Sequence, residues 1–431
     1  MKNKRGSYVI LAALLFSAIL ILVSAVLYAS GEEAISSTLD SFGKLWGRSI
    51  LAEYDLKLKD RYGIFAFYAD KATVEEKLDF YAEYSCGDKA YIDIKPITAS
   101  IEEYCLTDSE NFAKQLREAV LADTKPLPLA AKASAELSTG ENSQTSEYAA
   151  KAQPGRQENR YIKNRRVIKS LPSGGKGGGV SVLSLLGRLK EGVSGEAVMS
   201  AAAENIYMFR FFKDCMNDRG LGDSFFENEI EYILTGKLDD AAAREEVESK
   251  LSTLRNGLNL EYLYKCEEKR NAALAAAELL MPETPWLAQA LILEGWAYME
   301  ARNDIKLLYA GKEVPIIKRD ENWALSLENL LATEYGEEFE GTDFVSASSA
   351  EEADSEDYLS PARIEGKNYE EYLKILAAAL PQKSALLRMM DIIQINMKYT
   401  YCEWFRLSEC YVGLKYEIVI NNRTHNFEAE Y

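Results

Sequence analysis

The sequence predicts an α+β protein, mainly helical, with one N-terminal transmembrane helix and an extracytoplasmic helical domain that has a few short strands and a C-terminal β-hairpin. Three observations lead to this prediction. An uncharged apolar run occupies residues 7–29, helical periodicity and capping signals recur through the middle of the chain, and alternating apolar residues occur near its C-terminal end. A chain of 431 residues can form two or three domains, or one large domain with insertions.

The apolar run has the length of a membrane span. No charged residue falls between Arg5 and Glu32, and a helix of about 22 residues measures about 33 Å, which matches a hydrocarbon core of about 30 Å. Residues 1–6 form a basic leader, so the positive-inside rule places the N-terminus in the cytoplasm. We therefore expect a single-pass protein of the cell membrane that contacts the bilayer through residues 7–29 and has most of its chain outside the cytoplasm.

Two alternatives to an uncleaved anchor remain open. A cleaved secretory signal normally has an apolar region of only ~7–15 residues, and this run is longer. A prepilin-type leader is cut after a glycine that follows basic residues, which would make Gly6 the last leader residue and Ser7 the first mature one. Such leaders usually have glutamate at the fifth mature position, whereas Leu11 stands there.

Residues 30–123 form a juxtamembrane helix and an α/β segment. Strands are predicted near residues 64–68 and 91–97, and Thr107 and Glu110 form a capping box before another helix. Either the membrane helix runs on unbroken, or a separate amphipathic helix follows a bend at Gly31. In both cases one helix face is defined by apolar residues at three- and four-residue steps, namely Ile35, Leu39, Phe42, Trp46, Ile50 and Tyr54.

Residues 124–180 have the composition of a disordered low-complexity insertion, because they contain proline, glycine and serine and few large apolar residues. The insertion contains a basic cluster, for which we consider two interpretations: a contact patch for an acidic partner or a lipid headgroup, or a solvated linker. The cluster comprises Arg156, Arg160, Lys163, Arg165, Arg166 and Lys169.

The remaining chain divides into three segments. Residues 181–335 are strongly helical, with Gly236 predicted to end one helix and Pro285 to begin another. Residues 336–367 form an acidic loop. Residues 368–431 contain further helices, the first capped by Asn368, and a β-hairpin that turns near residues 421–422.

Composition narrows the chemistry. The net charge of −18 argues against nucleic acid as a partner, because phosphate binding needs a cationic surface. A zinc site or a Ser-His-Asp relay would have to use His425, the single histidine, which we expect on an exposed strand. We assign no catalytic, cofactor-binding or metal-binding residue, and we expect no enzyme activity and no cofactor.

Six cysteines occur without a C-x-x-C pair, which argues against a zinc ribbon or a thioredoxin-like site. Outside the cytoplasm thiols can oxidise, and six cysteines allow fifteen complete pairings. Proximity in sequence favours three disulfides, and buried free thiols are the alternative. The favoured pairs are Cys86–Cys105, Cys215–Cys266 and Cys402–Cys410.

Several short motifs are spread along the chain. They are Gly6-Ser7, AEYDLKL at 52–58, YGIF at 62–65, EIEYILTGK at 229–237, GWAYME at 295–300, GKEVP at 311–315 and RMMDIIQIN at 388–396. Together they resemble an uncharacterised family of bacterial membrane-anchored proteins with a TadE/TadG-like N-terminus, encoded near tight-adherence (Tad/Flp) pilus genes. The resemblance covers nearly the whole chain except the insertion. It implies a role in a pilus or secretion machine, with pilin-like or secretion-machine partners, and no known catalytic residue.

The expected function is therefore that of a membrane-anchored, pseudopilin-like structural or assembly component without catalytic activity. One alternative is a membrane-tethered cell-surface hydrolase that uses paired carboxylates, which requires a deep acidic pocket and a carboxylate of raised pKa. Another is an adhesin or receptor in which the insertion separates a binding head from the cell.

Overall fold

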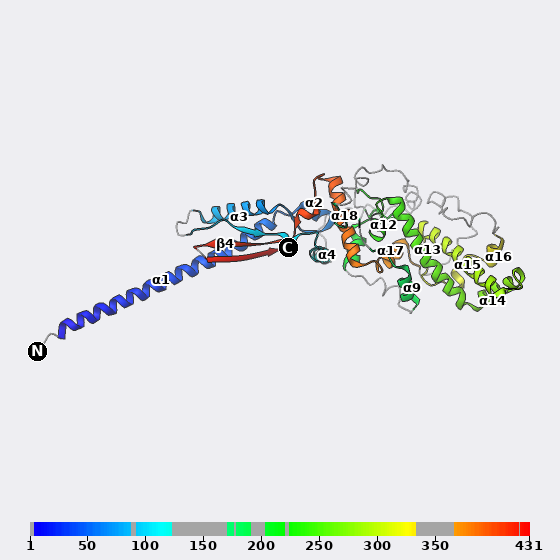
Figure 1. Cartoon of the computed structure of the whole chain (residues 1–431), viewed down its shortest axis with the longest axis horizontal. Coiled ribbons are helices and arrows are strands. Elements are labelled where there is room, and N and C mark those ends of the chain that lie inside the picture. The colour runs from blue at the N-terminus through cyan, green and yellow to red at the C-terminus, as the bar shows by residue number, and fades with distance from the viewer. Residues whose placement is uncertain are drawn as a thin grey trace, which may run out of the picture. The chain divides into compact units, whose positions relative to one another are not determined.

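The computed structural model describes residues 4–87, 92–122, 170–175, 178–190, 203–219, 224–332, 366–421 and 423–431. The chain divides into two compact units. Unit 1 comprises Met1–Lys59, Phe65–Leu106 and Ser408–Tyr431, and unit 2 comprises Asp60–Ile64 and Thr107–Leu407. The α+β, mainly helical fold class is confirmed (Figure 1).

Unit 1 combines segments from both ends of the sequence. Its strands form a three-stranded antiparallel sheet in the order β2-β4-β5 and a separate antiparallel pair, β1-β3. The elements are α1 (Lys4–Leu51), the start of α2 (Leu56–Tyr62), β1 (Phe67–Tyr68), α3 (Lys71–Cys86), β2 (Thr98–Ser100), the 3-10 helix η1 (Glu102–Tyr104), β3 (Cys410–Tyr411), β4 (Gly413–Ile420) and β5 (Arg423–Glu430).

The predicted hairpin is confirmed as β4 and β5. Its register pairs Ile418 with His425 and Ile420 with Arg423, and Asn421 adopts a positive φ of 48° at the turn, as asparagine does more readily than most residues. His425 is half-buried rather than fully exposed. The core of unit 1 lies where α1 and α3 pack against this sheet (Figure 1).

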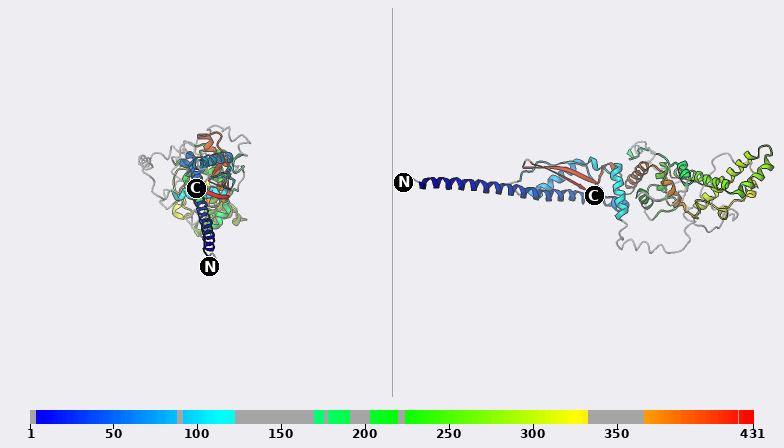
Figure 2. Two further views of the ribbon diagram at one scale, coloured as in Figure 1. Left: turned by 90° about the vertical axis from the view of Figure 1, so that its left-hand side faces the viewer. Right: turned by 90° about the horizontal axis from the view of Figure 1, so that it is seen from below.

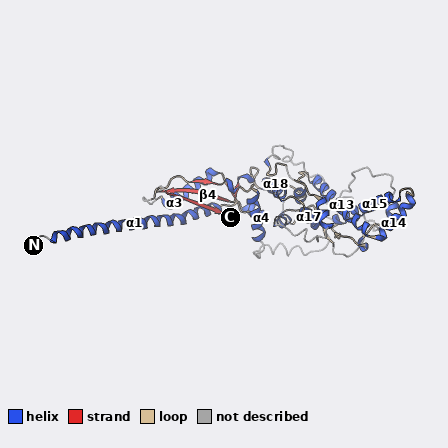
Figure 3. Ribbon diagram, turned by 60° about the horizontal axis from the view of Figure 1, so that its bottom comes forward, coloured by secondary structure: helices blue, strands red, loops and turns tan. Residues whose placement is uncertain are grey.

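Unit 2 is helical in its described residues. The long helices α13 and α15 pack against each other, and α14 packs on α15 (Figure 3). The elements are α4 (Ser109–Ala122), α9 (Val182–Lys190), α11 (Ala203–Phe211), α12 (Glu229–Thr235), α13 (Asp240–Lys265), α14 (Glu267–Leu280), α15 (Pro285–Tyr309), the 3-10 helix η3 (Asp320–Asn322), α16 (Leu327–Ala332), α17 (Tyr369–Ala377) and α18 (Gln382–Thr400). The 3-10 helix η5 (Leu407–Glu409) starts at Leu407, which is the last residue of unit 2.

Several predicted helix ends are confirmed. Gly236 ends α12 with a left-handed φ of 75°, and Pro285 begins α15. The side chain of Asn368 accepts a hydrogen bond from the backbone N–H of Glu371, which completes a capping box at α17. At α4 the prediction is one residue early, because the carboxylate of Asp108 accepts from the N–H groups that follow it and the helix begins at Ser109.

Two predictions in the loops are wrong. The strand expected over residues 91–97 lies instead at β2, and Ile94 makes only an isolated bridge with Ile420. The end of the predicted disordered insertion is folded: the Ser173 N–H donates to Asp391 at 2.9 Å, and the Gly178 N–H donates to the Ser384 hydroxyl at 2.9 Å. Partners on α18 therefore compensate for the low apolar content of this segment.

Candidate functional site

Helix α1 is 48 residues long and has no break at Gly31. Its stretch from Leu11 to Leu51 is, among the described residues, the one helix long and apolar enough to cross a membrane. The most apolar 18-residue window of this stretch has a mean hydropathy of 2.6, and none of that window is buried. The N-terminal part of α1 is thus a candidate single-pass membrane anchor. Of the two interpretations of the juxtamembrane region, the unbroken helix is confirmed (Figure 2).

The second half of α1 packs on the sheet by the predicted apolar stripe. Leu39, Trp46 and Ile50 are each only 2% exposed, and Ile35 and Phe42 pack against the same core. Burying a large apolar side chain contributes ~1.5–3 kcal/mol. The stripe therefore fixes the sheet firmly to the same helix that carries the membrane-length segment.

Two glycines allow the sheet to approach α1 closely. A Cβ at Gly43 would overlap the ring of Phe427, and one at Gly47 would lie 3.0 Å from the Cβ of Ala429. The hydroxyl of Tyr416 donates to the Gly43 carbonyl and accepts from the Gly47 N–H at 3.1 Å. One tyrosine of β4 thus bridges the carbonyl and N–H groups at the two ends of a single turn of α1.

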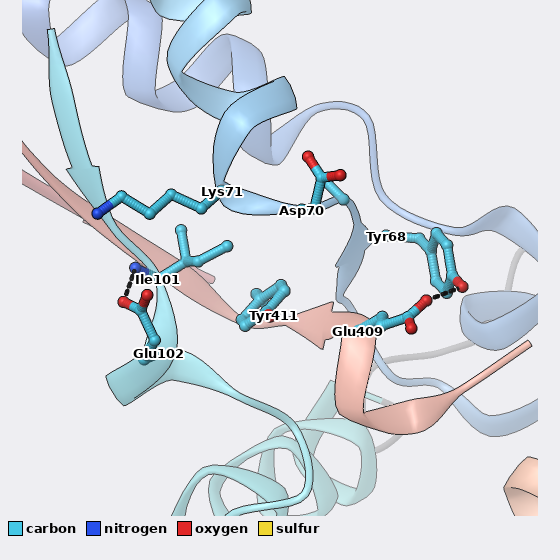
Figure 4. A pocket seen from close by; sticks show the side chains of 8 residues that line it. Tyr68, Asp70, Lys71, Ile101, Glu102, Glu409 and Tyr411 are labelled. Atoms are coloured by element: carbon cyan, nitrogen blue, oxygen red, sulfur yellow. Dashed lines mark hydrogen bonds between the residues drawn. The ribbon is translucent and has the colours of Figure 1, made fainter.

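Unit 1 also has a pocket of about 290 Å³ (Figure 4). Its acids have partners within the chain: Glu409 accepts from the Tyr68 hydroxyl, Asp70 from the Thr73 N–H at 2.8 Å, and Glu102 from the Ile101 N–H at 3.1 Å. Backbone hydrogen bonds lower the pKa of Asp70 and of Glu102. Both shifts run opposite to the raised pKa that a hydrolase with paired carboxylates requires of one acid. Its lining comprises Tyr68, Ala69, Asp70, Lys71, Ile101, Glu102, Glu409 and Tyr411.

Carboxylates of raised pKa occur instead inside unit 2, around α12, whose seven residues are all buried. Glu231 accepts hydrogen bonds from the Cys215 N–H at 3.1 Å and from the Tyr369 hydroxyl at 2.9 Å, while its Oε2 has no hydrogen-bond partner. Burial, together with the nearby charge of Asp214, raises the pKa of Glu231 to about 7.

Asp391 on α18 is similar. It accepts from the Ser173 N–H and, at 2.8 Å, from the Tyr232 hydroxyl, and burial raises its pKa to about 6. Glu229 accepts from the Lys213 N–H at 3.0 Å and from the Asn396 amide at 2.7 Å. These carboxylates connect α12 to segments before and after it, so their contacts serve the packing of unit 2.

A second buried charge cluster joins α13 and α15. The Arg255 Nε lies 2.9 Å from Asp304, and its guanidinium also donates to the carbonyls of Pro315 and Ile316 at 2.9 and 2.8 Å. Lys318 pairs with both Asp304 and Glu300. Every charge in this cluster has an opposite charge beside it, as burial demands. Among the described residues, no group of His, Cys, Asp or Glu side chains is arranged to hold a metal ion.

The predicted site residues have different outcomes. Gly6 and Ser7 lie within α1, and the basic cluster at residues 156–169 lies outside the described residues, as do residues 336–365 of the acidic loop. None of the six cysteines, all of which lie among the described residues, forms a disulfide, so the three favoured pairs are not formed in this structure. Burial raises the pKa of the Cys215 and Cys410 thiols well above the usual range, which disfavours the reactive thiolate.

Sequence reasoning missed the contact between α1 and the sheet. The signal was available as Gly43-x-x-x-Gly47 inside the apolar stripe, because glycines four residues apart on one helix face permit close packing. Nothing local, however, indicated that Tyr416 would be the partner, since 373 residues separate it from Gly43.

Comparison with known proteins identifies a family. A family model described as a family of unknown function (DUF5702) matches residues 136–422. This range includes most of unit 2 and the strands β3 and β4 of unit 1. No curated protein and no solved structure matches the chain. Because the match covers more than half of its length, the chain belongs to the DUF5702 family.

Proposed function

We propose that this protein is a membrane-anchored, pseudopilin-like structural or assembly component of a Tad-type pilus or secretion system, and that it is not an enzyme. The observation that carries the proposal is that α1 runs without a break from its membrane-length segment to the part that packs against the sheet of unit 1. The motifs that resemble TadE/TadG-like proteins support the same assignment. In this proposal the basic leader stays in the cytoplasm and the bulk of the chain lies outside it.

A continuous helix has a mechanical consequence. The 41 residues from Leu11 to Leu51 extend about 60 Å, of which about 30 Å would cross the hydrocarbon core. The rest is fixed to the sheet by the buried stripe and by Tyr416. Displacement of the anchor along its axis would therefore move unit 1 with it, as an assembly subunit needs and a flexible tether would not allow.

The anchor is tested by two matched substitutions in α1. Leu15 and Leu45 are 57% and 56% exposed, but only Leu15 lies in the proposed span. Leu15→Arg places a charge in the bilayer at a cost of ~2.5–3.5 kcal/mol, and we expect it to reduce the membrane fraction and the amount of protein recovered with pili. Leu45→Arg should change neither. Normal localisation and pilus formation with Leu15→Arg would refute the proposal.

The continuity of the helix is tested at Ser37, an exposed position between the span and the first fully buried residue of the stripe. Ser37→Pro removes a helical N–H and kinks the helix at a cost of ~3 kcal/mol, whereas Ser37→Ala keeps it straight. Both variants should fractionate with membranes, and only Ser37→Pro should lose assembly. Equal assembly by the two variants would mean that the anchor acts as a simple tether.

A further inference from the structure

An exposed apolar surface lies where α14 turns into α15 in unit 2. Leu279 is 85% exposed, Trp286 is 70% exposed and Leu291 is 60% exposed. Together with their neighbours they form what we call the apolar tip, which contains more large exposed apolar side chains than any other short stretch of the described chain outside α1. The apolar tip comprises Leu279, Leu280, Met281, Trp286, Leu287 and Leu291.

The core of unit 2 does not require these side chains. Helices α14 and α15 already pack through Ala273, Ala277, Ala288 and Ile292, all of them buried. Soluble monomers rarely expose contiguous apolar patches larger than a few hundred Å², and larger exposed patches mark interaction sites. Tryptophan is moreover the residue that most often dominates the binding energy of an interface.

The charges around the apolar tip select the kind of partner. Residues 271–301 contain no lysine or arginine, whereas Glu278, Glu283 and Glu294 are exposed there. The Glu294 carboxylate accepts from the neutral Asn256 amide at 2.8 Å, which leaves its charge uncompensated by that contact. The apolar tip is therefore bordered by negative charge on both helices.

We propose that the apolar tip binds an amphipathic helix of a partner protein whose apolar stripe is flanked by lysine or arginine. Such a helix would cover the exposed leucines and Trp286 while its cations approach Glu278 and Glu283. A second copy of this chain fits worse, because a two-fold contact would place these acids against one another. An anionic bilayer is disfavoured by the same repulsion.

The test measures binding of two labelled peptides, each about five helical turns long, to the full chain in nanodiscs of zwitterionic lipid. Both peptides have the same leucine stripe, flanked by lysine in one and by glutamate in the other. We expect only the Leu/Lys peptide to bind above the level of empty nanodiscs, with an affinity that falls as salt is added. The double variant Leu279→Ser/Trp286→Ser should weaken it at least about tenfold.

Two controls match these changes. Trp404→Ser alters a tryptophan that is 79% exposed elsewhere in unit 2 and should leave binding unchanged. Glu278→Gln/Glu283→Gln should weaken the Leu/Lys peptide and flatten its salt dependence, whereas Glu267→Gln/Glu268→Gln at the other end of α14 should not. Leu279 and Trp286, which the double variant replaces by serine, and all four glutamates are exposed, so the fold is expected to tolerate the changes.

Equal binding of the two peptides would overturn the proposal. The same would follow if Trp404→Ser weakened binding of the Leu/Lys peptide as much as Leu279→Ser/Trp286→Ser does. So would dimerisation of the chain or binding to zwitterionic vesicles that depends on Trp286, because either would assign the apolar tip to another occupant. The inference goes beyond the proposed function and does not depend on it. A chain that binds the peptide but forms no pilus refutes only the assembly role, and the reverse result refutes only this one.

Discussion

At the scale of single residues, the polar interior of unit 2 is the feature that composition did not reveal. No local sequence pattern distinguishes Glu229, Glu231 and Asp391 from acids on a solvated helix face. Their burial depends on donors that come from residues 173, 213, 215, 369 and 396. No local pattern can bring such distant donors together, so the pKa shifts were not predictable.

These shifts predict how stability depends on pH. The pKa of Glu231 is about 7 in the folded chain and 4.5 for a free side chain, so between these values the folded state binds more protons than the unfolded state. The contribution is fully present below pH ~4.5 and is lost as the pH rises through about 7. Asp391, with a pKa of about 6, acts in the same direction.

We therefore expect the wild-type chain to lose on the order of 2–3 kcal/mol of unfolding free energy from Glu231 between pH 5 and pH 8. Glu231→Gln should remove this part of the pH dependence, whereas Glu268→Gln, an exposed acid at the start of α14, should not. Denaturant titrations of each chain at the two pH values measure this change in unfolding free energy. A Glu231→Gln chain with the same pH dependence as wild type would contradict the assignment.

At the scale of elements, the parts of the fold that depend on local chemistry were predictable. The ends of α12, α15 and α17 follow from Gly236, Pro285 and Asn368, because each acts on its own backbone. The location of β2 and the folding of residues 170–175 were not predictable. Both are determined by distant partners, namely β4 for the strand and α18 for the segment that contains Ser173.

The contact of α1 with the sheet leads to a prediction about its glycines. Alanine normally stabilises a helix relative to glycine by ~0.5–1 kcal/mol, and Gly31→Ala should do so, because its Cβ would meet nothing within 4 Å. Gly43→Ala should instead destabilise unit 1 by about 1–3 kcal/mol, since its Cβ would overlap the Phe427 ring.

Thermal unfolding of the two variants in detergent distinguishes these effects. A second substitution, Phe427→Leu, should restore part of the stability of Gly43→Ala by making room for the methyl group. If Gly43→Ala were as stable as Gly31→Ala, the close approach between α1 and β5 would have to be abandoned.

At the scale of the whole molecule, the order of segments is the notable feature. Unit 2 comprises residues 60–64 and 107–407, and unit 1 is built from segments that lie before, between and after these two ranges. In unit 2 the charge cluster of Arg255, Asp304 and Lys318 and the α13–α15 contacts use only residues of the range 107–407, while Tyr62 of the short segment accepts a hydrogen bond from the Asn396 amide at 3.0 Å. Unit 2 therefore contains its own core, whereas unit 1 needs both ends of the sequence.

This arrangement predicts the result of a truncation. A chain ending at residue 421 lacks β5 and so exposes the stripe of α1 that packs against Phe427 and Ala429. We expect limited proteolysis to cut unit 1 of this chain rapidly while a fragment containing α12 to α15 survives as it does in the wild type. Equal resistance of unit 1 in both chains would show that the sheet does not depend on the hairpin.

The distance in sequence between α1 and β4 also has a consequence for biosynthesis. Tyr416 follows Gly43 by 373 residues. The apolar N-terminal segment of α1 is therefore available to enter a bilayer long before the ribosome has made Tyr416, which bridges Gly43 and Gly47 in the folded chain. During that interval Leu39, Trp46 and Ile50 have no sheet to cover them. This apolar face of α1 therefore stays uncovered by the sheet until the last residues of the hairpin have been synthesised.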